Sequence, residues 1–213
     1  MASLLDDLTS QLQGNTLSQM SRQLGADEAS TAQAISMALP MLIGGLANEA
    51  QTPDGAQSLS RALEEDHDGS LLDNVSALFG PATTGAADVA VPRALNSAGI
   101  LEHVLGRKRE PVQQGIGRAT GLNSQQIGRL LMMLAPLVMA YLGRRKRETG
   151  LGPSEIGNEL QAERQEVERR APGLGGILGQ MFGGGATEDR PGIADDLARM
   201  APNVLGRMFG GSR

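Results

Sequence analysis

The sequence predicts an all-α protein, and three observations lead to that fold class. Apolar residues recur at the spacing of one helix face, as in Leu4, Leu8 and Leu12. No segment of useful length alternates polar and apolar residues as a half-buried strand would. A helix–glycine–helix pattern also occurs twice, 96 residues apart from Gly25 to Gly121. We therefore expect a multi-helix bundle made from a duplicated helix-turn-helix-like module with kinked apolar helices, followed by a Gly-rich C-terminal tail.

The first copy of the module is expected within residues 1–79. A short helix ends at Gly25, because glycine readily adopts the left-handed backbone that closes a helix. Asp27 is expected to cap the long apolar helix that follows, since its carboxylate can accept from the first backbone N–H groups. Pro40 lies inside that helix, where it removes one backbone hydrogen bond and is expected to produce a kink.

A further helix and a polar turn complete this copy. Pro53 is expected at the first position of the helix, where its missing N–H costs nothing. The residues Asp66-His67-Asp68-Gly69 then break the helix, and Ser70 is expected to cap another one. Residues 80–92 are small and polar, and they predict a linker to the second copy.

The second copy is expected within residues 93–170 and ends in a strongly charged helix. Asn123 or Ser124 caps its longest apolar helix. Pro136 lies inside that helix at the position that corresponds to Pro40. Because a proline inside a helix costs about 3 kcal/mol, two prolines at equivalent positions indicate a duplication rather than chance.

Composition narrows the classes of function. The chain of 213 residues has no cysteine, which excludes disulfides, zinc–thiolate sites and cysteine nucleophiles. It opens without the basic segment of a signal peptide, and its best apolar run, residues 130–143, is shorter than the ~20 residues that span a bilayer. A cytoplasmic location is therefore expected. Residues 171–213 predict a Gly-rich tail with one amphipathic segment.

Charge is distributed unevenly along the chain. Residues 1–100 hold three arginines and twelve acids, a net charge of −9. Residues 101–213 hold sixteen basic residues and twelve acids, a net charge of +4. Opposite charges on the two halves favour head-to-tail attraction between copies, and simple solvation of a charged surface explains the same distribution.

Four segments resemble a known bacterial family. They are the opening residues 3–8, the run Ala38 to Ala47 (ALPMLIGGLA), the box Asp66 to Asn74 (DHDGSLLDN) and the run Leu130 to Gly143 (LLMMLAPLVMAYLG). Together they are similar to the bacterial family of unknown function numbered 937, over most of the chain. The resemblance implies a bacterial helical protein and brings no activity with it. Members of that family often end in a second Asp-Gly-Ser box, whereas this chain has Pro191 and Ile193 there.

The first box supplies the candidate metal ligands, Asp66 and Asp68. Closely spaced carboxylates followed by a glycine are typical of calcium loops. If these two residues take the third and fifth positions of such a loop, Val75 stands at the twelfth, where a bidentate glutamate is needed. The box therefore matches half a calcium loop, and a turn with a helix cap is the simpler interpretation.

Two basic clusters, Arg107-Lys108-Arg109 and Arg144-Arg145-Lys146-Arg147, favour an anionic partner. The second copy also carries Gln125, Gln126 and Arg129 on the long helix of its helix-turn-helix-like pattern, so nucleic-acid binding is one alternative. Because the clusters lie beside apolar helices, binding to an anionic membrane surface is another. Arginines at the end of a helix also complement its dipole without any partner.

The sequence contains no recognisable catalytic pattern. Its two histidines, His67 and His103, lack the spacing of metal ligands, and no nucleophile elbow or phosphate loop occurs. We therefore predict neither an enzyme nor a bound cofactor or small-molecule substrate. The duplicated apolar helices predict instead a self-associating structural or scaffold protein. The residues expected to form the contacts of a homo-oligomer or filament are Leu39, Leu42, Ile43, Leu134, Leu137 and Val138.

Overall fold

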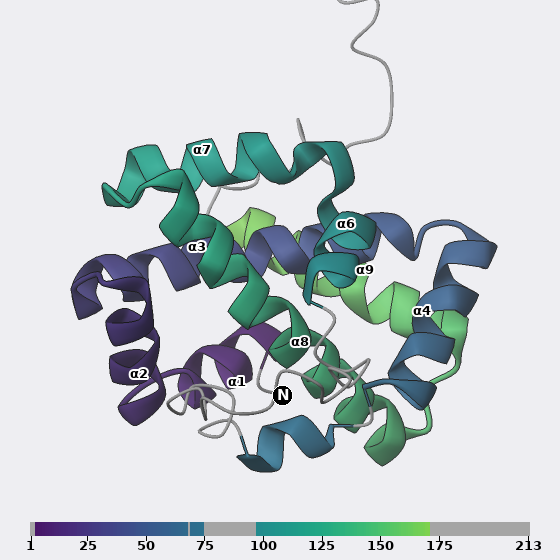
Figure 1. Ribbon diagram of the computed structural model, residues 1–213. Helices are drawn as coiled ribbons and strands as arrows, with labels where there is room; N and C mark the ends of the chain where they lie inside the picture. The colour runs from purple at the N-terminus through teal and green to yellow at the C-terminus, as the bar shows by residue number, and fades with distance from the viewer. Residues whose placement is uncertain (1–2, 68, 75–96, 171–213) are drawn as a thin grey trace, which may run out of the picture. The chain divides into compact units, whose positions relative to one another are not determined.

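A computed structural model describes residues 3–67, 69–74 and 97–170 of the chain (Figure 1). These residues are helices and short connections, and no strand occurs among them, which confirms the all-α fold class. They belong to one compact unit that spans residues 1–182, and a second unit spans residues 183–213. The predicted linker at 80–92 and the predicted tail at 171–213 lie outside the described residues.

The helices follow one another in two similar series. The first series contains α1 (Leu4–Gln11), α2 (Asn15–Leu24), α3 (Glu28–Glu49), α4 (Pro53–Glu65) and the 3-10 helix η1 (Ser70–Asn74). The second contains α6 (Ser97–Leu105), the 3-10 helix η3 (Gly106–Lys108), α7 (Arg109–Thr120), α8 (Ser124–Thr149) and α9 (Pro153–Arg170).

The structure confirms the duplicated helix–turn–helix pattern and its caps. Gly25 and Gly121 both adopt the left-handed conformation at the ends of α2 and α7. The Asp27 side chain accepts from the backbone N–H of Ser30 at the start of α3. Asn123 caps α8 in the same way, and it also forms a reciprocal capping box with Gln126. Local sequence is sufficient to predict these helix ends because the capping groups lie within a few residues of each other.

Three predicted boundaries move. The helix expected to open at Pro111 begins two residues earlier, at Arg109. Ser70 was expected to cap an α-helix, but it is the first residue of the 3-10 helix η1. The helix expected to end in the second basic cluster continues two residues beyond it to Thr149, so α8 is 26 residues long, whereas α3 has 22. The cluster therefore lies on the last turns of a helix, where it complements the helix dipole.

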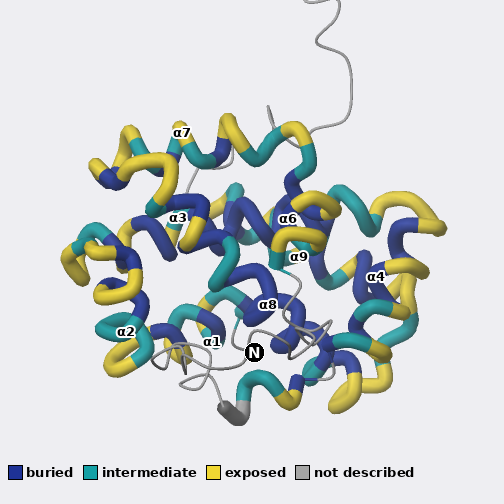
Figure 2. The backbone as a smooth tube through the Cα atoms, in the orientation of Figure 1, coloured by how far each residue is buried: buried dark blue, intermediate teal, exposed yellow. Residues whose placement is uncertain are grey.

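The two predicted modules share one hydrophobic core. The long helices α3 and α8 run through the centre of the described unit, where Figure 2 shows them as largely buried. The shorter helices surround them and keep an exposed outer face. α4 packs against α8 and α9 packs against α3, so the last helix of each half contacts the long helix of the other. The modules are thus halves of one unit rather than separate bodies.

The six apolar residues predicted for self-association belong to this core. Leu39, Leu42, Ile43, Leu134, Leu137 and Val138 are each 2% exposed or less. The apolar stripes of α3 and α8 are therefore covered within a single chain, where they hold the two halves together. The sequence-based assignment of these residues to contacts between copies is corrected, because a side chain buried in one chain offers no surface to another.

One glycine on each of the central helices α3 and α8 allows another part of the backbone to approach that helix closely. A Cβ at Gly45 on α3 would lie 2.5 Å from the Val104 carbonyl oxygen of α6. A Cβ at Gly143 on α8 would overlap the carbonyl oxygen of His67, which follows α4. Both positions require glycine for space, since the backbone of each is helical.

Of the described helices, α3 and α8 are long and apolar enough to cross a membrane by length and composition. However, 67% of the apolar window of α3 and 78% of that of α8 are buried inside the protein. Such burial is typical of core helices, which agrees with the expectation for the run at residues 130–143.

Candidate functional site

The Asp-His-Asp-Gly box is a turn that lies against α8. Asp66 ends α4 as its C-cap residue, and Gly69 has a φ of +91°, a conformation that L side chains rarely adopt. A Cβ at Gly69 would also come within 2.7 Å of the Arg144 side chain. Asp68 lies outside the described residues. Within the described residues, no group of three or more acids and histidines could hold a metal ion.

A cavity of about 380 Å³ lies beside this turn, between α3, α4, α6 and α8. Its apolar walls come from Leu46, Leu59, Ala62, Ile100, Val104 and Met139, and its polar lining comes from Glu49, Ser58, Asp66, His67 and His103, with Gly99 completing the wall. The cavity therefore brings together both histidines of the chain. The sequence does not relate them, because they are distant in the chain: His67 lies in the turn after α4 and His103 lies on α6.

His67 is a core residue rather than part of an exposed polar turn. It is 5% exposed, and its Nδ1 atom has no hydrogen-bond partner. Burial lowers the pKa of His67, and the neighbouring Asp66 carboxylate opposes this shift by raising it. The imidazole is therefore neutral at pH 7, with a buried nitrogen whose hydrogen-bonding capacity is unused. A buried polar atom without a partner costs about 1–3 kcal/mol.

At the mouth of the same cavity, His103 pairs with Glu49. The distance between His103 Nε2 and Glu49 Oε1 is 3.4 Å, and the His103 side chain is 69% exposed. The pair links α6 to the end of α3. The described lining contains no lysine or arginine, so carboxylates are its permanently charged groups.

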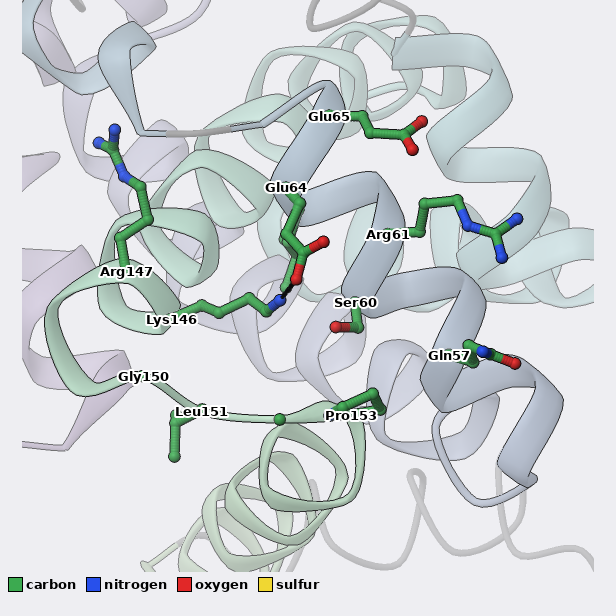
Figure 3. A pocket seen from close by; sticks show the side chains of 12 residues that line it. Gln57, Ser60, Arg61, Glu64, Glu65, Lys146, Arg147, Gly150, Leu151 and Pro153 are labelled. Atoms are coloured by element: carbon green, nitrogen blue, oxygen red, sulfur yellow. Dashed lines mark hydrogen bonds and ion pairs between the residues drawn. The ribbon is translucent and has the colours of Figure 1, made fainter.

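A second, more polar hollow of about 640 Å³ lies between α4, the end of α8 and the start of α9 (Figure 3). Glu64 and Lys146 meet in it, with Ser60 and Arg61 on the same side of the hollow as Glu64. The Lys146 side chain is 9% exposed, whereas that of Glu64 is 62% exposed. The buried ammonium is thus neutralised by a carboxylate from the first half, which attaches α4 to α8.

The two basic clusters have different surroundings. In the second cluster, Arg145 pairs with Glu159 of α9 and Lys146 pairs with Glu64 of α4, so these charges join helices inside the unit. In the first cluster, Arg107 is exposed, and Lys108 and Arg109 are half-buried. Arg118, at the other end of α7, is also exposed. The cationic surface thus follows α7 rather than the long helix α8.

In the helix-turn-helix-like pair α7–α8, little of the second helix is exposed. The exposed positions of α8 near its start are Ser124, Gln125 and Arg129, and the helix is then buried through most of its length. A recognition helix lies in the major groove of DNA with its N-terminal residues against the base edges. The first two turns of α8 are available for such a contact, and the rest of the helix is core.

The residues of this site lie in a region shared with other bacterial proteins. The family described as a bacterial protein of unknown function (DUF937) matches residues 6–145, which is about two thirds of the chain. The chain belongs to this family. The match confirms the resemblance seen in the sequence. No curated protein and no solved structure matches the chain.

The DUF937 match covers both histidines and the glycines that surround their cavity. It ends at residue 145, before Lys146 and before α9. The two-histidine cavity is therefore built from family-matched residues, whereas the polar hollow also uses residues beyond the match. The 96-residue offset found in the sequence also sets Gly45 against Tyr141 and Ala47 against Gly143, two pairs that the sequence analysis did not compare.

Proposed function

We propose that this DUF937 protein is a non-enzymatic, self-associating scaffold whose copies join head to tail through charged surfaces. One surface is the basic α7 surface, made of Arg107, Lys108, Arg109 and Arg118. The other is the acidic α4 surface, made of Asp54 and Glu65. The contact joins the α7 surface of one copy to the α4 surface of the next.

The observation that carries this proposal is the separation of charge between these two helices. Residues 106–120 contain four basic residues and one glutamate, a net charge of +3. Residues 53–66 contain four acids and one arginine, a net charge of −3. α7 runs along the top of Figure 1 and α4 lies at its right. A contact between unlike surfaces repeats from copy to copy and closes a ring or extends a filament.

The proposal differs from the sequence-based one in the residues that make the contact. The apolar stripes of α3 and α8 are used within the chain, so charge has to supply the attraction between copies. Such contacts weaken as salt screens them over a Debye length of about 8–10 Å at physiological ionic strength. The assembly is therefore expected at low salt and high protein concentration.

The test is the mass of the full chain in solution, measured by light scattering after gel filtration at low and high salt. The double variant Arg107→Glu/Arg118→Glu and the double variant Asp54→Lys/Glu65→Lys should each stay monomeric at low salt. An equimolar mixture of the two should associate again, because each restores the complement that the other lacks. The control for the α7 variant, Arg22→Glu/Arg169→Glu, makes the same change in net charge at other positions and should associate like the unmodified chain.

Two results would remove the proposal. One is a monomer at every salt and protein concentration. The other is an assembly that both double variants leave intact, since the contact would then use other residues. Far-UV circular dichroism of each variant shows whether loss of association comes from loss of folding.

A second candidate function, nucleic-acid binding, is favoured by the same α7 surface. A polar hollow along α7 is lined by Arg107, Arg109, Gln113 and Gln114, with Glu110 also in the lining, and phosphates bind arginine and amide side chains of this kind. Binding of a labelled duplex should then fall steeply with salt. The α7 double variant should abolish it, whereas the α4 double variant should leave it unchanged or strengthen it. Loss of self-association in both variants, by contrast, supports the scaffold.

A further inference from the structure

We propose that the cavity between α3, α4, α6 and α8 is a binding site for a small apolar amine. The ligand would place its hydrocarbon or aromatic part against the apolar walls and its amino group among His67, Asp66 and Glu49. This site is independent of the charged surfaces on α4 and α7 that carry the proposed self-association.

The shape and lining of the cavity support a ligand of this size. Its volume of about 380 Å³ lies within the range of small-molecule sites, which bury most of a ligand against apolar walls and orient it with a few polar groups. The walls are contributed by four helices from both halves of the chain, so they are held by the core rather than by a loop. A ligand would therefore meet a largely preformed site.

His67 supplies the observation that points to a ligand. The residue lines the cavity, is 95% buried, and leaves Nδ1 without a hydrogen-bond partner. The torsion that rotates an imidazole ring is broad, so the torsion by itself does not hold Nδ1 away from the cavity. A ligand N–H or O–H that donates to this nitrogen would satisfy a group that the protein itself leaves unsatisfied.

The charges around the cavity select the kind of ligand. Asp66 and Glu49 line it, and no lysine or arginine is among its described lining residues. His103 Nε2 lies 3.4 Å from Glu49 Oε1 and so occupies one side of that carboxylate. The negative potential of these carboxylates favours a cation over a neutral molecule and a neutral molecule over an anion. The cost of removing an ion from water is offset only by a nearby opposite charge. A protonated amine on an apolar body satisfies both the walls and the carboxylates.

The test compares three probes with similar apolar parts and different head groups: 2-phenylethylamine, 2-phenylethanol and 3-phenylpropionate. Each is titrated into the full chain by isothermal calorimetry, with chemical-shift changes in the ¹⁵N spectrum locating the site. The amine should bind with a Kd on the order of 0.1–1 mM, as expected for a ligand of this size. The alcohol should bind several-fold more weakly, and the acid should bind least.

Three variants make the test specific. Asp66→Asn should reduce the preference for the amine over the alcohol several-fold, with little effect on the alcohol itself. His67→Leu should weaken both the amine and the alcohol, since it removes the shared acceptor. Ala62→Leu should fill the cavity and abolish binding of all three probes. The matched control is Ala32→Leu, the same substitution at an exposed position of α3, which should bind all three probes like the unmodified chain.

The proposal is overturned if none of the probes binds at millimolar concentration, or if all three bind equally. It is also overturned if Ala62→Leu, shown by circular dichroism to be folded, binds them as well as the control does. The association measured by light scattering is expected to be the same with and without the amine. A failure of this site and a failure of the proposed scaffold are thus separate results.

Discussion

The two halves of the unit share a helix plan but differ where their helices meet the rest of the core. At the 96-residue offset, α2–α3 corresponds to α7–α8 in order, caps and internal proline. Near the ends of the two long helices the correspondence changes: α3 has Gly45 and Ala47 where α8 has Tyr141 and Gly143. Gly45 admits the backbone of α6, whereas Tyr141 donates a hydrogen bond across to Asp7 of α1.

The polar contacts between the halves also differ in which helix carries the acidic residue. Asp7 on α1 accepts from Tyr141 on α8 at 2.7 Å. Its counterpart His103 on α6 pairs with Glu49 on α3. The acid is on the short helix in one contact and on the long helix in the other. Side chains at corresponding positions therefore make different contacts, although the two halves arrange their helices alike. Part of the opposite charge of the two halves is paired within one chain.

The largest expected effect that tests this comparison is at Gly143. Replacing it by Ala forces a Cβ into the carbonyl oxygen of His67, so we expect the free energy of unfolding to fall by roughly 2–4 kcal/mol. Urea unfolding followed by circular dichroism measures this change. The same substitution at Gly115 of α7, where a Cβ meets nothing within 4 Å, should leave stability unchanged or raise it by up to about 1 kcal/mol. Equal effects at the two glycines would contradict the close approach at α8.

The next effect concerns Tyr141 at high pH. Burial, followed by the contact with Asp7, raises its pKa to about 12. The unfolded chain then ionises near pH 10 while the folded chain does not, so stability is fully present below pH 10 and falls between pH 10 and 12. The loss is on the order of 2 kcal/mol. Because the chain contains one tyrosine and no tryptophan, the absorbance of tyrosinate reports this group alone.

Tyr141→Phe is the control for this alkaline loss. It should remove the dependence of stability on pH in this window and cost about 1 kcal/mol at neutral pH, through the lost hydrogen bond to Asp7. A titration midpoint near pH 10 in the folded chain would show that the phenol is not held in its neutral form.

A smaller effect is expected at the two corresponding N-termini. The Gln126 side chain joins the halves, because its Nε2 donates to the carbonyl oxygens of Leu24 and Gly25 at 3.1 and 3.3 Å. Its counterpart Ser30 lies in the first turn of α3, next to its own cap. Gln126→Ala should cost about 1–2 kcal/mol and Ser30→Ala less than about 0.5 kcal/mol in urea unfolding. Similar costs at the two positions would show that the bonds between halves contribute nothing.

The smallest effect is expected at low pH from His67. Its pKa is lowered in the folded chain, so the unfolded chain takes up a proton first as the pH falls below the ordinary value of 6.5. This contribution to stability is present above pH 6.5 and is lost as the pH decreases. His67→Phe keeps the backbone contact with Gly143 and should flatten this part of the stability curve between pH 7 and pH 5. An unchanged curve in the variant would assign the acid dependence to other groups.

Much of the fold could be predicted from the sequence because its signals are local. The glycine caps at Gly25 and Gly121 and the side-chain caps at Asp27 and Asn123 act within a turn of the helix they end. The candidate sites were predicted less well. The two histidines converge only when α4 and α6 both pack against α8. The apolar stripe of α3 cannot reveal whether another chain or the same chain covers it.

The sequence alone determined the helices, the caps at Gly25, Asp27, Gly121 and Asn123, the duplication and the family, since each follows from residue spacing along the chain. The tertiary structure decided which surfaces remain. It buried the stripes of α3 and α8 in one core, paired Lys146 with Glu64, left α7 as a cationic surface, and enclosed both histidines in one cavity. The physical reason is that burial and pairing depend on contacts between residues far apart in the chain, and helical periodicity specifies a face to be covered without specifying what covers it.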